Sequence, residues 1–133
     1  MAERVYCLYR GKDQESILMQ KNACHDFAEK KGWNIVDEEQ EIGVSGYKAC
    51  ADDRVKLQRI RKAVEQGKFD ILLVFMYDRL GRNLNETPFI AEWFTKKGIH
   101  VWSVYEGEII DGVDAERMLD YIRFWQTDEA QKL

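Results

Sequence analysis

The sequence predicts an α/β fold, an open and mostly parallel sheet of four to five strands flanked by helices. Short β-prone runs alternate with segments of helical periodicity, and the connections between them are short. The run from Ile71 to Met76 is continuously apolar, which is typical of a parallel strand covered on both faces. A length of 133 residues with 45% hydrophobic content suits one domain, residues 1–133, with its own core.

The first third of the chain predicts a strand, a helix and a second strand. Val5 to Tyr9 is β-prone and ends at Arg10 and Gly11. A helical pattern follows, and Gly32 is a typical helix stop. The residues on the faces of this helix are Ile17, Gln20, Cys24, Phe27 and Ala28. Asn34 to Val36 predicts the second strand.

After this second strand the sequence is acidic, from Asp37 to Glu41, and continues as an irregular loop as far as Gly46. A magnesium site is one interpretation of the acidic run, but charge runs of this kind are usually solvated, so we predict a solvated loop. Asp52 or Asp53 is expected to cap the next helix, which ends at Gly67. The apolar stripe of that helix is Leu57, Ile60 and Val64.

Three further elements follow the strand at Ile71 to Met76. Thr87-Pro88 opens a helix that stops at Gly98, and Ile99 to Val104 predicts another strand. A helix is expected from about Asp114 to the C-terminus, with an apolar edge that includes Trp125. Because this last helix has no Gly or Pro stop signal, we expect the chain to be a fragment of a longer protein. Trp33, Trp93 and Trp102 are expected to pack in or near the core, and Trp125 at an interface.

Composition limits the classes of function. A net charge of −4 disfavours a free-standing nucleic-acid binder, although it allows a catalytic module in which a few arginines converge. The three cysteines, Cys7, Cys24 and Cys50, form no CxxC pair, which favours reduced thiols in the cytoplasm over a disulfide framework or a zinc site. Neither a membrane span nor a secretory signal is present in the sequence, and we expect no metal and no cofactor.

The most informative segment lies at the end of the strongest predicted strand. Asp78 follows the apolar run directly, and Arg79 and Arg82 stand three residues apart. In an α/β fold ligands bind at the carboxyl ends of the strands, where Arg10 is also expected. Two guanidiniums at this spacing can grip one phosphate with planar, fork-shaped donors. The alternative is a plain cap or a surface ion pair, which contributes little energy.

Five segments carry a resemblance to a known family. They are Leu8-Tyr9-Arg10, Gln20, Gly43-Val44-Ser45-Gly46, Asp53-Arg54 and Tyr77-Asp78-Arg79-Leu80-Gly81-Arg82. In their residues and order the chain resembles the N-terminal catalytic domain of serine site-specific recombinases, the resolvase/invertase family. It looks closest to the transposon and phage integrase type of Gram-positive bacteria. The resemblance extends from Val5 to the last predicted helix.

The resemblance implies DNA recombination without a metal or cofactor, through cleavage and rejoining of double-stranded DNA with a 5′-phosphoserine intermediate. It implies a bacterial, cytoplasmic protein that forms homodimers and a synaptic homotetramer, with its DNA-binding region outside this chain. The phosphate-binding residues would be Arg10, Arg54, Arg79 and Arg82. Asp78 would orient a guanidinium or take part in proton transfer, Ser45 would support the pocket, and Gln20 would fix the geometry of the site.

One position departs from the family pattern Tyr-x-Arg-x-Ser, in which the serine is the nucleophile, because Arg10 is followed by Gly11 and Lys12. Three explanations stay open: a serine-bearing loop is missing from this sequence, the loop is deleted, or Ser16 has taken over. We favour the first two equally, because Ser16 is expected to cap the first helix. A deleted loop would leave a catalytically inactive, recombinase-like oligomerisation module.

A nucleotide-binding or phosphatase domain is disfavoured, because neither GxxxxGK[ST] nor GxGxxG is present.

Overall fold

In the computed structural model, residues 3–42, 55–80 and 87–109 are described. They form a five-stranded sheet in the order β2-β1-β3-β4-β5, in which the first four strands are parallel and β5 pairs antiparallel with β4. The strands are β1 (Arg4–Gly11), β2 (Asn34–Ile42), β3 (Ile71–Val74), β4 (His100–Ser103) and β5 (Gly107–Ile109). The predicted open, mostly parallel sheet is therefore confirmed.

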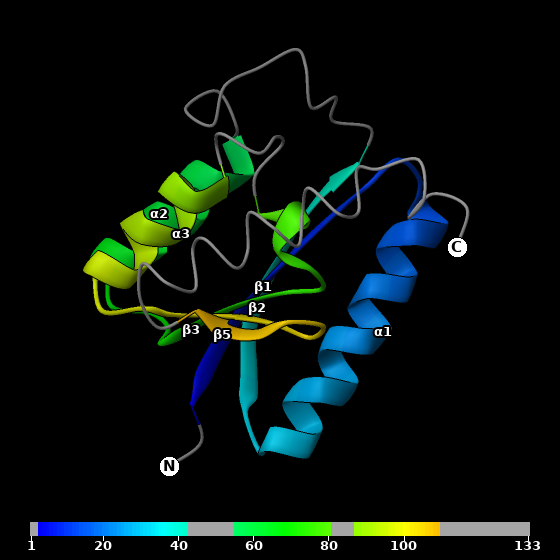
Figure 1. The fold of residues 1–133 in the computed structure, drawn as a ribbon, viewed down its shortest axis with the longest axis horizontal. Coiled ribbons are helices and arrows are strands. Elements are labelled where there is room, and N and C mark those ends of the chain that lie inside the picture. The colour runs from blue at the N-terminus through cyan, green and yellow to red at the C-terminus, as the bar shows by residue number, and fades with distance from the viewer. Residues whose placement is uncertain (1–2, 43–54, 81–86, 110–133) are drawn as a thin grey trace.

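Helices cover both faces of this sheet, as Figure 1 shows: α1 (Gln14–Lys31) lies on one side, and α2 (Val55–Glu65) and α3 (Thr87–Lys96) lie on the other. The predicted stops are confirmed, since Gly32, Gly67 and Gly98 follow the three helices with positive φ angles of 74°, 65° and 83°. Such angles favour glycine, which has no Cβ to clash. A 3₁₀ turn, η2 (Tyr77–Arg79), follows β3 directly.

The core is split by the sheet into two clusters. On the α2 and α3 face, residues of β1 and β3 pack with both helices and with Tyr77 and Leu80. On the α1 face, alternate residues of the same two strands pack with the helix. The fully buried residues of α1 there include Ile17 and Cys24, and those of the strands include Val5, Cys7, Tyr9 and Leu73. The continuously apolar β3 contributes to both clusters, as expected for a strand covered on both faces.

We predicted that the acidic stretch after residue 36 is a solvated loop. In the structure this stretch is part of β2, which continues to Ile42. The carboxylates find partners in the neighbouring strand and helices: the Tyr6 hydroxyl donates to Glu39 at 3.1 Å, and the Tyr9 hydroxyl donates to Glu38 at 2.6 Å. Glu41 is only 5% exposed. The prediction was wrong because sequence alone does not show which hydroxyls and cations stand opposite an acidic strand.

Other boundaries shift by a few residues. β3 ends at Val74, two residues before the predicted end, and β4 spans only His100–Ser103. Trp33, Trp93 and Trp102 are half-buried, which confirms their expected packing role. Trp33 and Trp102 meet edge-to-face with ring centroids 5.2 Å apart. The predicted cap at Asp52 or Asp53, the helix from 114 and Trp125 lie outside the described residues.

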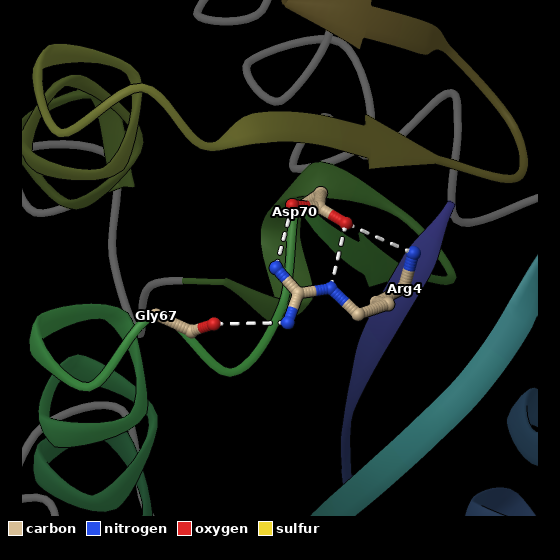
Figure 2. Close-up of polar contacts among 3 residues, drawn as sticks. All are labelled: Arg4, Gly67 and Asp70. Atoms are coloured by element: carbon tan, nitrogen blue, oxygen red, sulfur yellow. Dashed lines mark hydrogen bonds and ion pairs between the residues drawn. The ribbon is translucent and has the colours of Figure 1, made fainter. Parts of the chain in front are cut away.

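The amino edge of the sheet is fastened by Arg4 and Asp70. The Nε and Nη2 atoms of Arg4 donate to the two carboxylate oxygens of Asp70 at 3.0 Å each, and Nη1 donates to the Gly67 carbonyl at 2.9 Å, as Figure 2 shows. A pocket of about 470 Å³ lies at this edge, lined in part by Arg4, Tyr6 and Lys68. The contacts join β1 to the loop between α2 and β3, at the end of the strands opposite to Arg10.

Candidate functional site

Arg10 and Arg79 come from the carboxyl ends of two neighbouring strands. β1 and β3 are paired in parallel up to Leu8 and Val74, and Arg10 and η2 follow directly beyond that pairing. Side chains alternate along a strand, so Arg10 shares a face with Tyr6 and Leu8. That is the face on which Tyr77 packs, and η2 contacts β1 there. The fold therefore directs both arginines to one rim of the sheet.

Gln20 fixes the backbone of Arg10. Its Nε2 donates to the Arg10 carbonyl at 2.8 Å, and its Oε1 accepts from the Arg10 N–H at 3.1 Å. The Gln20 side chain is fully buried, so both bonds are shielded from water. Buried polar groups need such partners, and satisfied networks hold their members in one geometry. Gln20 can thus hold the base of the Arg10 side chain in a fixed place.

Ser16 does not cap α1, contrary to our prediction. The N-cap is Asp13, whose carboxylate accepts from the Ser16 N–H at 2.8 Å. The Ser16 hydroxyl instead accepts from Gln20 Nε2 at 3.3 Å and lies against Gly11, where an added Cβ would stand 2.6 Å from the hydroxyl oxygen. The prediction missed this because Asp13 is also a strong cap former and stands three residues earlier. The shared Gln20 amide brings the Ser16 hydroxyl close to the Arg10 backbone.

Arg79 is the last residue of η2 and is partly buried. Its N–H donates to the Met76 carbonyl at 2.9 Å, which closes the turn. The Nε atoms of Arg10 and Arg79 are both buried. Partial burial limits the competition from water and strengthens the interaction of a guanidinium with an anion. This turn and the end of β1 therefore supply two cationic groups that can bind a phosphate.

Two residues on β4 and in the following turn support η2 and were not anticipated. The Glu106 carboxylate accepts from the Tyr77 N–H, and the fully buried Ser103 hydroxyl donates to the same carboxylate. The Ser-x-x-Glu spacing of Ser103 and Glu106 is a capping-box signal that could have found them. Such a spacing normally indicates the start of a helix, whereas this one follows a strand.

Glu41 was likewise missed as a neighbour of the site. It pairs in register with Arg10 between β2 and β1, and it is buried. The strand register therefore places a buried carboxyl group opposite Arg10, beside the cationic rim. The acidic stretch is visible in the sequence, but its contact with the site is not, because only the strand register brings Glu41 opposite Arg10.

The other predicted site residues are not all described. Ser45, Arg54 and Arg82 lie outside the described ranges, and of Asp78 only the backbone, in η2, is described. Of the predicted set, Gln20 contacts the backbone of Arg10, and Arg79 lies in the turn that follows the neighbouring strand β3.

No metal centre is formed by the residues that the structure describes, since they contain no group of three or more His, Cys, Asp or Glu side chains placed to hold an ion. Cys7 and Cys24 are buried free thiols within this part of the chain. In the same ranges no helix is long and apolar enough to cross a membrane.

The chain matches known proteins in sequence and in fold. Residues 10–129 match the family described as "Resolvase, N terminal domain". No curated protein sequence matches the chain. Among solved structures, the N-terminal catalytic domain of TP901-1 integrase is 27% identical, with a TM-score of 0.74, covering 93% of this chain and 96% of that one.

Two further structures are similar. The C-terminal catalytic domain of ISC1926 TnpA, an IS607-like serine recombinase, is 27% identical with a TM-score of 0.67, covering 91% of this chain and 80% of that one. A resolvase family site-specific recombinase from Streptococcus pneumoniae shares the fold at 20% identity, with a TM-score of 0.72 and coverage of 98% and 92%. Because the family match spans nearly the whole sequence, the chain belongs to the resolvase family of serine recombinases, through its N-terminal domain.

Proposed function

We propose that this chain is the catalytic domain of a site-specific DNA recombinase and that it binds the scissile phosphate of double-stranded DNA at the rim formed by Arg10 and Arg79. The observation that carries the proposal is the position of the two arginines beyond the carboxyl ends of the paired segments of β1 and β3, which are neighbouring parallel strands, with Gln20 fixing the Arg10 backbone. Arg54 and Arg82 would add further phosphate contacts, and Ser45 would support the pocket.

The chemistry explains why arginines are needed. When a hydroxyl attacks a phosphodiester, negative charge builds on the phosphoryl oxygens, and preorganised donors stabilise it most effectively. A guanidinium offers two parallel N–H bonds to a phosphate and stays charged at every physiological pH. In the proposed reaction a serine hydroxyl loses its proton as its oxygen bonds to phosphorus, the bond to the 3′ oxygen breaks, and the 3′ oxygen gains a proton, so that one proton passes from the serine side to the leaving group. Asp78 would orient a guanidinium or take part in that proton transfer.

The attacking group defines a second candidate function. Lys12 occupies the position where the family pattern has its serine, and it is exposed at the rim. An ammonium cannot replace a hydroxyl as the nucleophile of a phosphoserine mechanism. This observation favours a domain that binds DNA phosphate and pairs with other subunits without cutting. The Ser16 hydroxyl is the alternative nucleophile, since it shares the Gln20 amide with Arg10.

A covalent-trapping assay separates these functions. The chain and its full-length parent would be incubated with nicked duplex substrates that prevent religation, and protein–DNA adducts would be counted on denaturing gels. An adduct that is lost in Ser16→Ala identifies Ser16 as the nucleophile. An adduct that survives Ser16→Ala points to another serine, whereas DNA binding without any adduct establishes the non-cutting module.

Lys12→Ser provides the matched gain-of-function variant, because it places a serine two residues after Arg10 at an exposed position. If the rim is otherwise competent, Lys12→Ser forms an adduct and Lys12→Ala does not. Tandem mass spectrometry across Tyr9 to Gln20 of the protein from its native source tests whether a serine-bearing loop is present there.

The proposed partners and location follow from the family to which the chain belongs. We place the domain in the bacterial cytoplasm as part of a longer protein, with a homodimer that pairs into a synaptic homotetramer on DNA. With a net charge of −4, the chain alone is expected to bind DNA weakly, because phosphate contacts dominate affinity. Tight, sequence-selective binding by the isolated chain at physiological salt would contradict this assignment.

A further inference from the structure

The turn between β4 and β5 is attached to the start of η2 by Glu106. Its carboxylate accepts from the Tyr77 N–H, at 3.2 Å to one oxygen and 3.4 Å to the other. The Ser103 hydroxyl donates to the same carboxylate at 3.0 Å, and Ser103 Oγ accepts from the Glu106 N–H at 2.7 Å. The Glu106 side chain is thus held at both ends, by its own turn and by η2.

A second contact joins the same two segments. The Tyr77 hydroxyl donates to the Gly107 carbonyl, and the Tyr77 side chain is 4% exposed. Tyr77 is therefore bound to the β4–β5 turn through its backbone and through the far end of its ring. Gly107 has a φ of 92°, so the turn takes this shape where glycine has no steric penalty.

The turn η2 depends on this outside support. Met76, at its N-cap position, makes no side-chain capping bond, and η2 is only three residues long. Short 3₁₀ turns have poor hydrogen-bond geometry and define their own shape weakly. The carboxylate of Glu106 supplies the missing acceptor at the amino end, where a negative charge is also favoured. Glu106 does so from the β4–β5 turn, and the residue that it contacts, Tyr77, lies two residues before Arg79.

We propose that Glu106 is a positioning residue for Arg79: it orients the turn that carries the guanidinium, and thereby the phosphate contact, without touching DNA itself. This inference rests on the proposed function, because it assumes that Arg79 binds a DNA phosphate. Ser103 supports Arg79 indirectly, because its hydroxyl donates to the Glu106 carboxylate and holds it in place. The β4–β5 turn is then part of the binding rim although none of its residues is a phosphate ligand.

The test is a double-mutant cycle on DNA binding. Affinity for a short duplex would be measured by fluorescence anisotropy at low salt for the full chain, Glu106→Ala, Arg79→Ala and the double variant. Glu106→Ala is expected to weaken binding roughly tenfold, the order of a lost hydrogen bond to a charged group. In the Arg79→Ala background the same substitution is expected to change nothing, since coupled residues are not additive.

Two variants control for plain structural damage. Glu108→Ala alters the next acidic side chain of the same hairpin, which pairs with the exposed His100 at 2.8 Å, and is expected to leave DNA affinity unchanged. Glu106→Gln keeps an oxygen acceptor for the Tyr77 N–H and is expected to recover most of the affinity. Amide hydrogen exchange at Tyr77 is expected to accelerate in Glu106→Ala and not in Glu108→Ala.

The outcomes are distinct. If Arg79→Ala leaves DNA affinity unchanged, the proposed function is wrong at this residue. If Arg79→Ala weakens binding but Glu106→Ala does not, or if the two effects add fully, the positioning role is wrong and the phosphate site stands. Coupling of the two substitutions, with recovery in Glu106→Gln, supports the positioning role.

Discussion

The side-chain amide of Gln20 makes two hydrogen bonds with the backbone of Arg10, as a neighbouring strand would. β1 pairs with β3 only as far as Leu8, and beyond that point the Gln20 amide donates to the Arg10 carbonyl and accepts from the Arg10 N–H. A side-chain amide carries one donor group and one acceptor, the same pair that a peptide unit presents. A side chain of α1 thereby holds the β1 backbone beyond its pairing with β3, at Arg10, which is the proposed phosphate ligand.

Gln20→Ala is expected to destabilise the chain and weaken DNA binding. The substitution leaves two backbone groups of Arg10 without their buried partner, at a cost of about 1–3 kcal/mol in the free energy of unfolding. Urea denaturation measures the stability, and anisotropy measures the affinity. Asn22→Ala, at an exposed position of the same helix, serves as the control. Equal effects of the two substitutions would argue against the Gln20 contact.

Gly11→Ala is expected to lower stability through crowding. The new Cβ would lie 2.6 Å from Ser16 Oγ and 2.8 Å from Ser16 Cβ, so the start of α1 must shift. Overpacking of this kind costs roughly 1–3 kcal/mol. Thermal unfolding of Gly11→Ala is compared with that of Lys12→Ala, an exposed neighbour. Recovery of stability in Gly11→Ala/Ser16→Gly would trace the loss to this contact, and its absence would point elsewhere.

Removal of the Arg79 charge is expected to change the salt dependence of DNA binding. Loss of one phosphate contact lowers the slope of log affinity against log salt by about 0.9. Arg79→Lys keeps the charge and the slope but loses the planar fork, so it binds more weakly at every salt concentration. Arg59→Ala is the control, because Arg59 is exposed on α2 and pairs with Glu39. A slope in Arg79→Ala equal to that of the parent chain would contradict the proposed contact.

Stability is expected to fall in acid through Glu38. Burial opposes ionisation of this carboxyl, but hydrogen bonds with His25 and Tyr9 outweigh the burial and lower its pKa below the ordinary value of 4.5. A lowered folded-state pKa stabilises the fold above the unfolded value, and this contribution is lost as pH falls through the folded value. The loss therefore begins below about pH 4.5.

Glu38→Gln tests this assignment, because glutamine still accepts a hydrogen bond from Tyr9 but does not titrate. The loss of unfolding free energy between pH 7 and pH 3 is expected to be smaller in Glu38→Gln than in the parent chain. Glu29→Gln, at an exposed position of α1, should leave the pH dependence unchanged. A parallel pH profile in Glu38→Gln and the parent chain would assign the acid sensitivity to other groups.

The fold class, the order of the described elements and the placing of Arg10 near the carboxyl end of a strand could be predicted from the sequence. Apolar periodicity and glycine stops are local signals, and Gly32, Gly67 and Gly98 end their helices as predicted. The run at Ile71 to Val74 could be recognised as a doubly covered strand because its burial leaves a local pattern in the sequence.

Contacts between side chains that are far apart in the sequence could be identified from the tertiary structure alone. The register between β1 and β2 places Glu41 opposite Arg10, and the stretch expected to be an acidic loop pairs with β1 as part of β2, where the hydroxyls of β1 donate to two of its carboxylates. The same holds for Glu106, whose carboxylate accepts from the Tyr77 N–H although the two residues are 29 positions apart in the sequence. Hydrogen bonds between distant segments depend on how the layers pack, and a linear pattern carries no record of that packing.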